Sequence, residues 1–106
     1  MNAGACLVQI LLPLRTRDGS DVPAPLFAEV RDELTQRFGG VTAYSRNPAT
    51  GLWKRTEAEV ERDQVIMVEV VVDAFDRDWW RQYRERLARR FDQEEIHARA
   101  IAIERV

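Results

Sequence analysis

The residues of this chain that are best suited to chemistry are one histidine and a few polar side chains within predicted strands. His97 is the only histidine, and an imidazole can act as a general base near neutral pH. With Tyr44, Glu69 and Arg99 it would give a cofactor-free enzyme an acid, a base and a cation. A wider polar set would suit the binding of a small molecule if it shares one face of a sheet. Its members are Gln9, Tyr44, Arg46, Glu69, His97 and Arg99.

A structural interpretation competes with this functional one. Glu69 can pair with Arg99 or Arg46 across strands, which would satisfy a half-buried carboxylate and do nothing more. Ion-pair networks of this kind often resemble functional sites. We therefore favour a protein without catalytic activity. The alternative is an enzyme of the monooxygenase or isomerase kind, with Glu69, His97, Arg99 and Tyr44 lining a cavity over the sheet.

The sequence offers few metal ligands and no recognisable nucleophile. Its single cysteine excludes a disulfide framework and a cysteine-based zinc site, and a lone histidine does not make a usual zinc site. Neither Ser20 nor Ser45 lies in a nucleophile-elbow motif. Gly39-Gly40 lacks the spacing and the lysine of a phosphate-binding loop. We expect no metal and no cofactor.

The elements that must position these side chains are strands, which the apolar runs predict. Short apolar or alternating segments bounded by turn signals are typical of strands. Leu52–Arg55 is interpreted as the returning arm of a hairpin after a turn at Asn47–Gly51. The main predicted strands are Cys6–Leu14, Val41–Arg46, Gln64–Val72 and Ile96–Val106.

Two amphipathic helices separate these strands. The first begins near Pro25, where a missing N–H costs nothing, and stops at Gly39-Gly40. The second follows Asp76, a good N-cap. Each helix carries an apolar stripe spaced by three or four residues. The stripes are Phe27, Val30, Leu34 and Phe38 in the first helix, and Trp80, Tyr83 or Arg84, Leu87 and Phe91 in the second.

The order of elements, strand-helix-strand-strand-helix-strand, predicts a single α+β domain over residues 1–106. Two split βαβ units of this kind form the ferredoxin-like plait, a four-stranded antiparallel sheet with two helices on one face. The first and third strands are the most apolar, as central strands should be. The outer two carry the charges, as edge strands should.

Several short motifs of the chain resemble a protein family. The motifs are Arg37-Phe38-Gly39-Gly40-Val41-Thr42 and Gly51-Leu52-Trp53. Followed by an apolar strand, they resemble small bacterial α+β proteins of unknown function, over residues 6–106. The resemblance implies a ferredoxin-like or dimeric α/β-barrel-like fold. It implies no known reaction and no catalytic residues.

Alternation along the strands divides the predicted sheet into two faces. The fully apolar set of each central strand should meet the helices, so the set with Gln9 or Glu69 should lie on the helix-free face. In the last strand, Ala98, Ala100 and Ala102 are small enough to face a close helix. The helix-free face then holds an apolar group: Leu7, Leu11, Val65, Met67, Val71, Ile101 and Ile103.

This apolar group makes the helix-free face a poor surface for contact with water. A second copy of the chain, packed sheet against sheet, is the simplest cover, because closed twofold dimers are the commonest oligomers. We therefore predict a homodimer through this face. The leading function is a small binding or assembly module, and a small-molecule ligand is left open.

The second helix is strongly basic, with only Asp78 and Glu85 to offset its arginines. Such charge would suit phosphate or nucleic acid, but a solvated face with Glu85 and Arg89 paired is the commoner arrangement. The chain lacks the signature of RNA-recognition domains. Nucleic-acid binding through this helix is therefore a further alternative. The arginines are Arg77, Arg81, Arg84, Arg86, Arg89 and Arg90.

The composition is that of an ordinary globular domain. Of 106 residues, 45% are hydrophobic and 32% charged, and the net charge of -2 gives no general attraction to nucleic acid or acidic membranes. No apolar run reaches the roughly 18 residues that a membrane span needs. The first residues lack the basic region of a signal peptide. We expect a cytoplasmic protein with no membrane partner.

Overall fold

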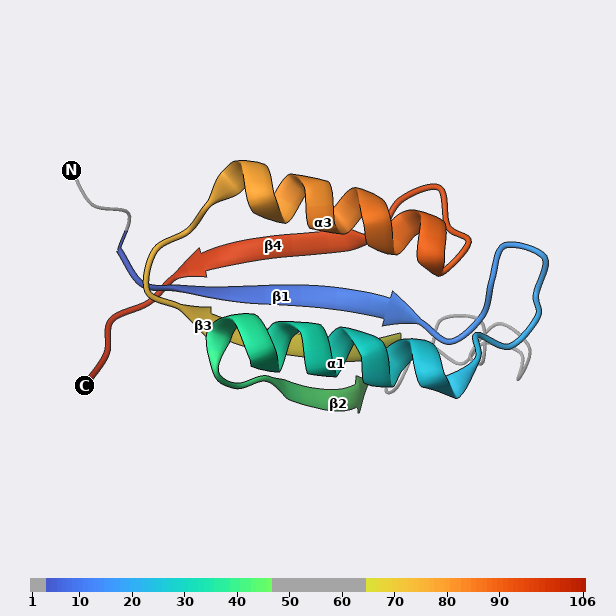
Figure 1. Ribbon diagram of the computed structural model, residues 1–106, viewed down its shortest axis with the longest axis horizontal. Coiled ribbons are helices and arrows are strands. Elements are labelled where there is room, and N and C mark those ends of the chain that lie inside the picture. Colours follow the sequence, from blue (N-terminus) through green and yellow to red (C-terminus); the bar gives the residue numbers. More distant parts are fainter. Residues whose placement is uncertain (1–3, 47–64) are drawn as a thin grey trace, which may run out of the picture.

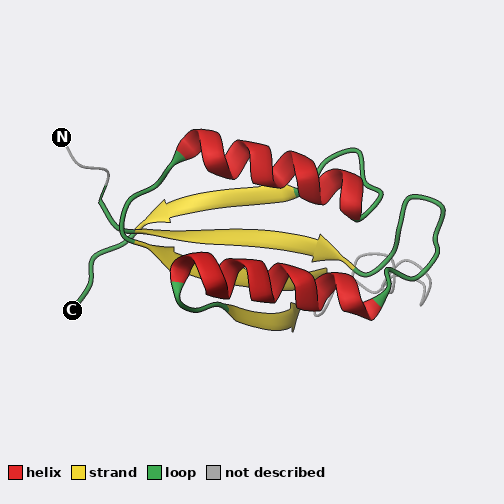
Figure 2. Cartoon of the chain, in the orientation of Figure 1, coloured by secondary structure: helices red, strands yellow, loops and turns green. Residues whose placement is uncertain are grey.

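Two helices lie against one face of an antiparallel sheet (Figures 1 and 2). The computed structural model describes residues 4–46 and 65–106, and for residues 43–46 the backbone alone. This arrangement confirms the predicted α+β class. The elements are β1 (Cys6–Pro13), α1 (Ala24–Phe38), β2 (Thr42–Arg46), β3 (Val65–Val72), α3 (Arg77–Arg90) and β4 (His97–Ala102).

β1 is the central strand of the sheet. It pairs antiparallel with β3 on one side and with β4 on the other, so that Gln9 faces Glu69 in β3 and Arg99 in β4. β2 pairs antiparallel with the other edge of β3, which gives the order β2-β3-β1-β4. Because Cys6 pairs with Ala102, the start of β1 and the end of β4 lie at the same end of the sheet (Figure 1).

The helix side of the sheet carries the core. Alternate residues of β1 and β3 are buried there against the two helices, and they are the residues that the sequence assigns to this side. The buried residues of these strands are Val8, Ile10, Leu12, Val68, Val70 and Val72. At roughly 1.5–3 kcal/mol for each buried aliphatic side chain, this layer is a major source of stability.

α1 begins and ends where local chemistry predicts. Pro23 and Pro25 flank its first residue, and prolines are tolerated in a first turn. Gly39 stops the helix with φ 83°, a left-handed conformation that glycine adopts without strain, and its N–H donates to the Thr35 carbonyl. Val30 and Leu34 are fully buried beneath it.

α3 is capped by Asp76, whose side chain accepts a hydrogen bond from the Trp79 backbone N–H at 3.1 Å. The predicted stripe is confirmed, with Tyr83 rather than Arg84 in the second place. Its buried members are Trp80, Tyr83, Leu87 and Phe91.

Aromatic rings join α1 to α3 near the start of α3. Phe38 stacks on Trp80 with a centroid distance of 5.2 Å and meets Trp79 edge to face at 5.4 Å. The guanidinium of Arg37 lies 4.2 Å from the centre of one Trp79 ring. These contacts fix α3 beside α1 at this end of the molecule.

Some predicted strand ends differ from the structure. β4 stops four residues before the end of the predicted Ile96–Val106, because its partner β1 begins at Cys6 and that residue already pairs with Ala102. Beyond it, Ile103 N–H still donates to the Ala5 carbonyl. The predicted turn at 47–51 and hairpin arm at 52–55 lie outside the described residues.

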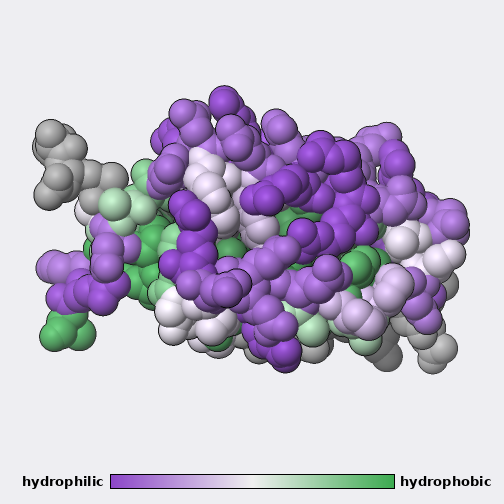
Figure 3. Space-filling model, viewed as in Figure 1, coloured by the Kyte–Doolittle hydropathy of each residue, from purple (hydrophilic) through white to green (hydrophobic). Residues whose placement is uncertain are grey.

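The outer surfaces of the two helices are polar (Figure 3). Hydrophobic residues show in the gap between the helices, which is the expected pattern for helices that pack on a sheet by one stripe each.

Replacing the α3 cap tests the local account of this helix. Asp76→Ala removes the acceptor for Trp79 N–H and should lower the free energy of unfolding by about 1 kcal/mol. Denaturant unfolding followed by circular dichroism measures the change. Asp78→Ala removes an acidic group from the same turn but no cap, so it should cost less. Equal losses in the two variants would contradict the capping role.

Candidate functional site

The helix-free face of the sheet is organised in rows of side chains that run across the strands. One row is polar. Gln9 Nε2 donates to Glu69 Oε2 at 2.6 Å, and Arg99 Nε donates to Gln9 Oε1 at 2.7 Å. The amide has one donor end and one acceptor end, so Gln9 holds an acid on one side and a cation on the other.

The sequence favours a direct pair of Glu69 with Arg99 or Arg46. The polar row differs from the pair with Arg99, and the side chain of Arg46 lies outside the description. β1 lies between β3 and β4, and neighbouring strands are about 4.8 Å apart, so Glu69 and Arg99 are separated by two strand spacings. Gln9 bridges the gap. The row satisfies a half-buried carboxylate, as the structural interpretation requires, through an intermediate amide.

The neighbouring row is apolar. Leu7 lies between Val71 of β3 and Ile101 of β4. Val71 is 44% exposed and Ile101 is 42% exposed, and they are the large hydrophobic residues of the described strands that remain open to water. In the described strands, the apolar row and the hydrogen-bonded polar row thus lie side by side on the helix-free face.

Other residues predicted for an apolar dimer surface are less open. Leu11, Val65 and Ile103 are partly buried, and Met67 is fully buried. Met67 therefore does not contribute exposed surface, contrary to its predicted place on an open face. Unlike Val71, it has a paired residue on each side, Leu11 in β1 and Tyr44 in β2. β2 begins opposite Glu69 and does not reach Val71.

The candidate acid–base residues are not gathered by the structure. His97 is exposed and has no hydrogen-bond partner among the described residues, although it pairs in register with Leu11. Tyr44 and Arg46 pair through their backbones with Met67 and Val65, and their side chains lie outside the description.

One cavity touches the acid of this set. It has a volume of about 430 Å³ and lies at the end of α1, where Glu69 meets Leu7, Val71, Gly40 and Thr42. Neither His97 nor Arg99 lines it. The cavity therefore contains the Glu69 carboxylate and two residues of the apolar row, Leu7 and Val71. The enzyme alternative also needs His97 as a base and Arg99 as a cation, and neither is present there.

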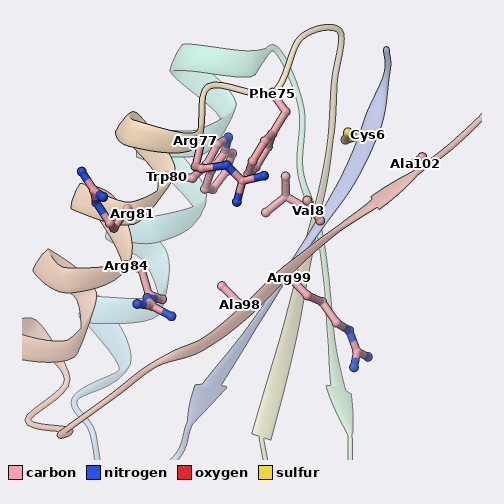
Figure 4. A pocket seen from close by; sticks show the side chains of 11 residues that line it. Cys6, Val8, Phe75, Arg77, Trp80, Arg81, Arg84, Ala98, Arg99 and Ala102 are labelled. Carbon is pink, nitrogen blue, oxygen red and sulfur yellow. The ribbon is translucent and has the colours of Figure 1, made fainter. Parts of the chain in front are cut away.

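A larger cavity, which was not predicted, lies between α3 and β4 (Figure 4). This α3–β4 groove has a volume of about 700 Å³. Arg77, Arg81 and Arg84 line its helix side, and the alanines of β4 line its strand side. The alanines were expected to admit a close helix; instead Ala100 and Ala102 stay exposed and the space remains open.

A signal for this groove does exist in the sequence. Arg77, Arg81 and Arg84 recur at helical spacing on one face of α3, and the residues of β4 that face the helices are all small. The sequence shows both patterns separately. Only their juxtaposition in space makes a groove.

A half-buried ion pair joins the two helices and was also missed. Arg90 donates from Nη1 and Nη2 to the two carboxylate oxygens of Glu33, both at 2.9 Å, and the Tyr83 hydroxyl donates to Glu33 at 2.7 Å. Burial works against ionisation of Glu33, but the hydrogen bonds from Arg90 and Tyr83 outweigh it and hold the pKa of its carboxyl below the ordinary value. Burial and the bond to Glu33 raise the pKa of Tyr83.

The described residues offer no metal centre. Within residues 4–46 and 65–106, no three His, Cys, Asp or Glu side chains come together as ligands would. In the same ranges, no helix has the length and apolar character to cross a membrane.

Comparison with known proteins gives no relative of this chain. No protein family, no curated protein and no solved structure matches it. Any function must therefore be argued from its own surfaces.

The Glu33–Arg90 pair gives the fold a pH dependence of known sign. The folded-state pKa of Glu33 is below its ordinary value of 4.5, so its stabilisation is present above that pH and is lost as the pH falls. Glu33→Gln should therefore destabilise the protein at pH 7, and its deficit should shrink below about pH 4.

Urea unfolding of both proteins at pH 7 and pH 3 measures this change. Glu85→Gln is the control, since Glu85 is an exposed carboxylate on α3. A deficit of Glu33→Gln that does not vary with pH would contradict the ionic account.

Proposed function

We propose that this protein is a small binding or assembly module that forms a homodimer through the helix-free face of its sheet. The observation that carries the proposal is the apolar row, in which Val71 and Ile101 lie exposed on either side of Leu7. Burial of such side chains against another apolar surface is favourable by roughly 25 cal/mol for each Å² removed from water.

The adjacent polar row supports a second copy as the partner. A twofold axis that is parallel to β1 and passes over it places each row of one subunit over the same row of the other. The order of the residues in the row is then reversed, so that β3 lies over β4. Glu69 then lies over the partner copy's cation, and Arg99 over its acid, while Val71 lies over the opposite isoleucine. Both rows are thus complementary to themselves, as a closed twofold interface requires.

The other in-plane axis is less favourable. An axis along the polar row, perpendicular to the strands, would place Glu69 of one subunit over Glu69 of the other. It would likewise place the two Arg99 side chains over each other. Like charges opposite one another oppose association. Charge therefore selects the axis parallel to β1.

The alternative functions have less support. For an enzyme, Glu69 already accepts a hydrogen bond from Gln9, and His97 has no described partner that would orient it. For nucleic-acid binding, Arg90 is already engaged by Glu33 in a half-buried pair. Asp78 and Glu95 add acidic groups beside Arg81 and Arg84 on the same surface.

We further propose that the fold is the ferredoxin-like plait. The order β2-β3-β1-β4 and the placement of both helices on one face support this assignment. The likeness to small bacterial α+β proteins rests on motifs of which Gly51-Leu52-Trp53 lies outside the described residues.

Charged substitutions in the apolar row test the dimer. Light scattering after size-exclusion chromatography should give the mass of two chains for the natural protein, because the exposed row is then covered. Val71→Asp or Ile101→Asp should raise the dissociation constant more than about tenfold, because a carboxylate would be buried without a partner.

Ala102→Asp is the matched control, since it adds the same charge on the groove side of β4. It should leave the mass unchanged. A monomer at all concentrations, or a dimer untouched by both row variants, would overturn the proposal.

Exchange of the charges tests the orientation. Glu69→Arg alone and Arg99→Glu alone should each weaken the dimer, because each places like charges across the interface. The double variant restores opposite charges and should recover most of the affinity. Sedimentation equilibrium measures the dissociation constants of the natural protein and the three variants. If the loss of binding free energy in the double variant equals the sum of the losses in the two single variants, the axis parallel to β1 is excluded.

A further inference from the structure

The α3–β4 groove combines an apolar floor with a cationic wall. Val8 and Trp80 form part of the floor and are almost fully buried, and Phe75 closes one end. In Figure 4, Arg77 lies close to Trp80 and Phe75, while the side chain of Arg99 extends to the other side of β4. The polar row of the helix-free face and the groove therefore use opposite sides of the same strand.

One of the groove arginines has no counter-charge among the described residues. Arg81 lies 3.3 Å from Asp78 and Arg84 lies 3.6 Å from Glu95, in exposed pairs of the kind that hold little energy. Arg77 makes no ion pair with a described residue, and its guanidinium lies 5.6 Å from the centre of the Phe75 ring. A cation thus stands at the apolar end of the groove.

The strand side of the groove is held open by its small residues. Ala98, Ala100 and Ala102 offer too little apolar surface to draw α3 over β4, and α3 is instead held towards α1 by the Phe38–Trp80 stack and the Glu33–Arg90 pair. The volume of about 700 Å³ falls within the range of pockets that accept small organic molecules.

We propose that the α3–β4 groove binds a small amphipathic anion, an organic carboxylate with an aromatic or short aliphatic body. The carboxylate lies at Arg77, where the planar guanidinium can donate two parallel hydrogen bonds. The body lies over the alanines of β4, of which Ala100 and Ala102 are exposed, and replaces the water that contacts them.

Charge argues against a second copy in the groove. A copy added along the free edge of β4 would bring two α3 helices together, each with Arg77, Arg81 and Arg84 on the side that faces the edge. The groove also lies opposite the proposed dimer surface. Its occupation therefore does not depend on the dimer, and either proposal can fail alone.

The first test uses 1-naphthoate as the probe and 1-naphthalenemethanol as its uncharged counterpart. Isothermal titration calorimetry should show naphthoate binding and much weaker binding of the alcohol. Arg77→Gln should weaken naphthoate at least about tenfold, because a charge-assisted bidentate contact is lost. Arg89→Gln, on the same helix but outside the groove, should bind as the natural protein does.

A second pair of variants tests the location. Ala100→Leu fills the groove and should abolish binding, whereas Ile101→Leu changes the opposite face and should not. Amide chemical shifts in a ¹H–¹⁵N spectrum should move at Ala98, Ala100 and Trp80. Circular dichroism melts confirm that each variant is folded.

Several results would overturn the proposal. The first is that naphthoate does not bind at millimolar concentration. The second is that the alcohol binds as tightly as naphthoate does. The third is that naphthoate still binds with unchanged affinity in both Arg77→Gln and Ala100→Leu. Shift changes confined to Leu7 and Ile101 would move the site to the helix-free face. Arg77-dependent binding of a single-stranded oligonucleotide, without naphthoate binding, would replace the small anion with nucleic acid.

Discussion

The pairing of β1 between β3 and β4 is the constraint on which the rest of the structure depends. A strand bonded on both edges has no freedom to rotate, so its alternate side chains are committed to opposite faces of the sheet. Val8, Ile10 and Leu12 are driven to the helix side and become core. Leu7 and Gln9 are driven to the helix-free face, where each becomes the centre of a cross-strand row.

The helices are positioned by each other as much as by the sheet. Apolar stripes bring both to the same face, but the stacking of Phe38 on Trp80 and the contacts of Glu33 with Arg90 and Tyr83 set the lateral position of α3. A bidentate, half-buried arginine pair restricts geometry more than an exposed pair does. The α3–β4 groove is the consequence, because a helix held towards α1 cannot also cover β4.

β4 carries the two surfaces of interest on its two sides. Its sequence alternates alanine with larger residues. The alanines line the groove with small side chains, and Arg99 and Ile101 lie on the helix-free face. A ligand on one side and a subunit on the other would contact the same short strand.

The sequence by itself determined the properties that depend on neighbouring residues along the chain. Period-two alternation in β1 and β3 identified the core side, since it follows from extended backbone geometry. The end of α1 at Gly39 and the cap at Asp76 were also predicted, because a left-handed turn and a first-turn hydrogen bond are local chemistry.

Tertiary structure alone decided what depends on distances between elements. The strand order inserts Gln9 between Glu69 and Arg99, so the expected direct pair is replaced by a bridged one. β2 begins opposite Glu69 and does not extend to Val71, which is exposed, whereas Met67 pairs with both neighbouring strands and is buried. The α3–β4 groove depends on where α1 holds α3. None of these follows from alternation or spacing, because each requires the relative positions of segments that are distant in the chain.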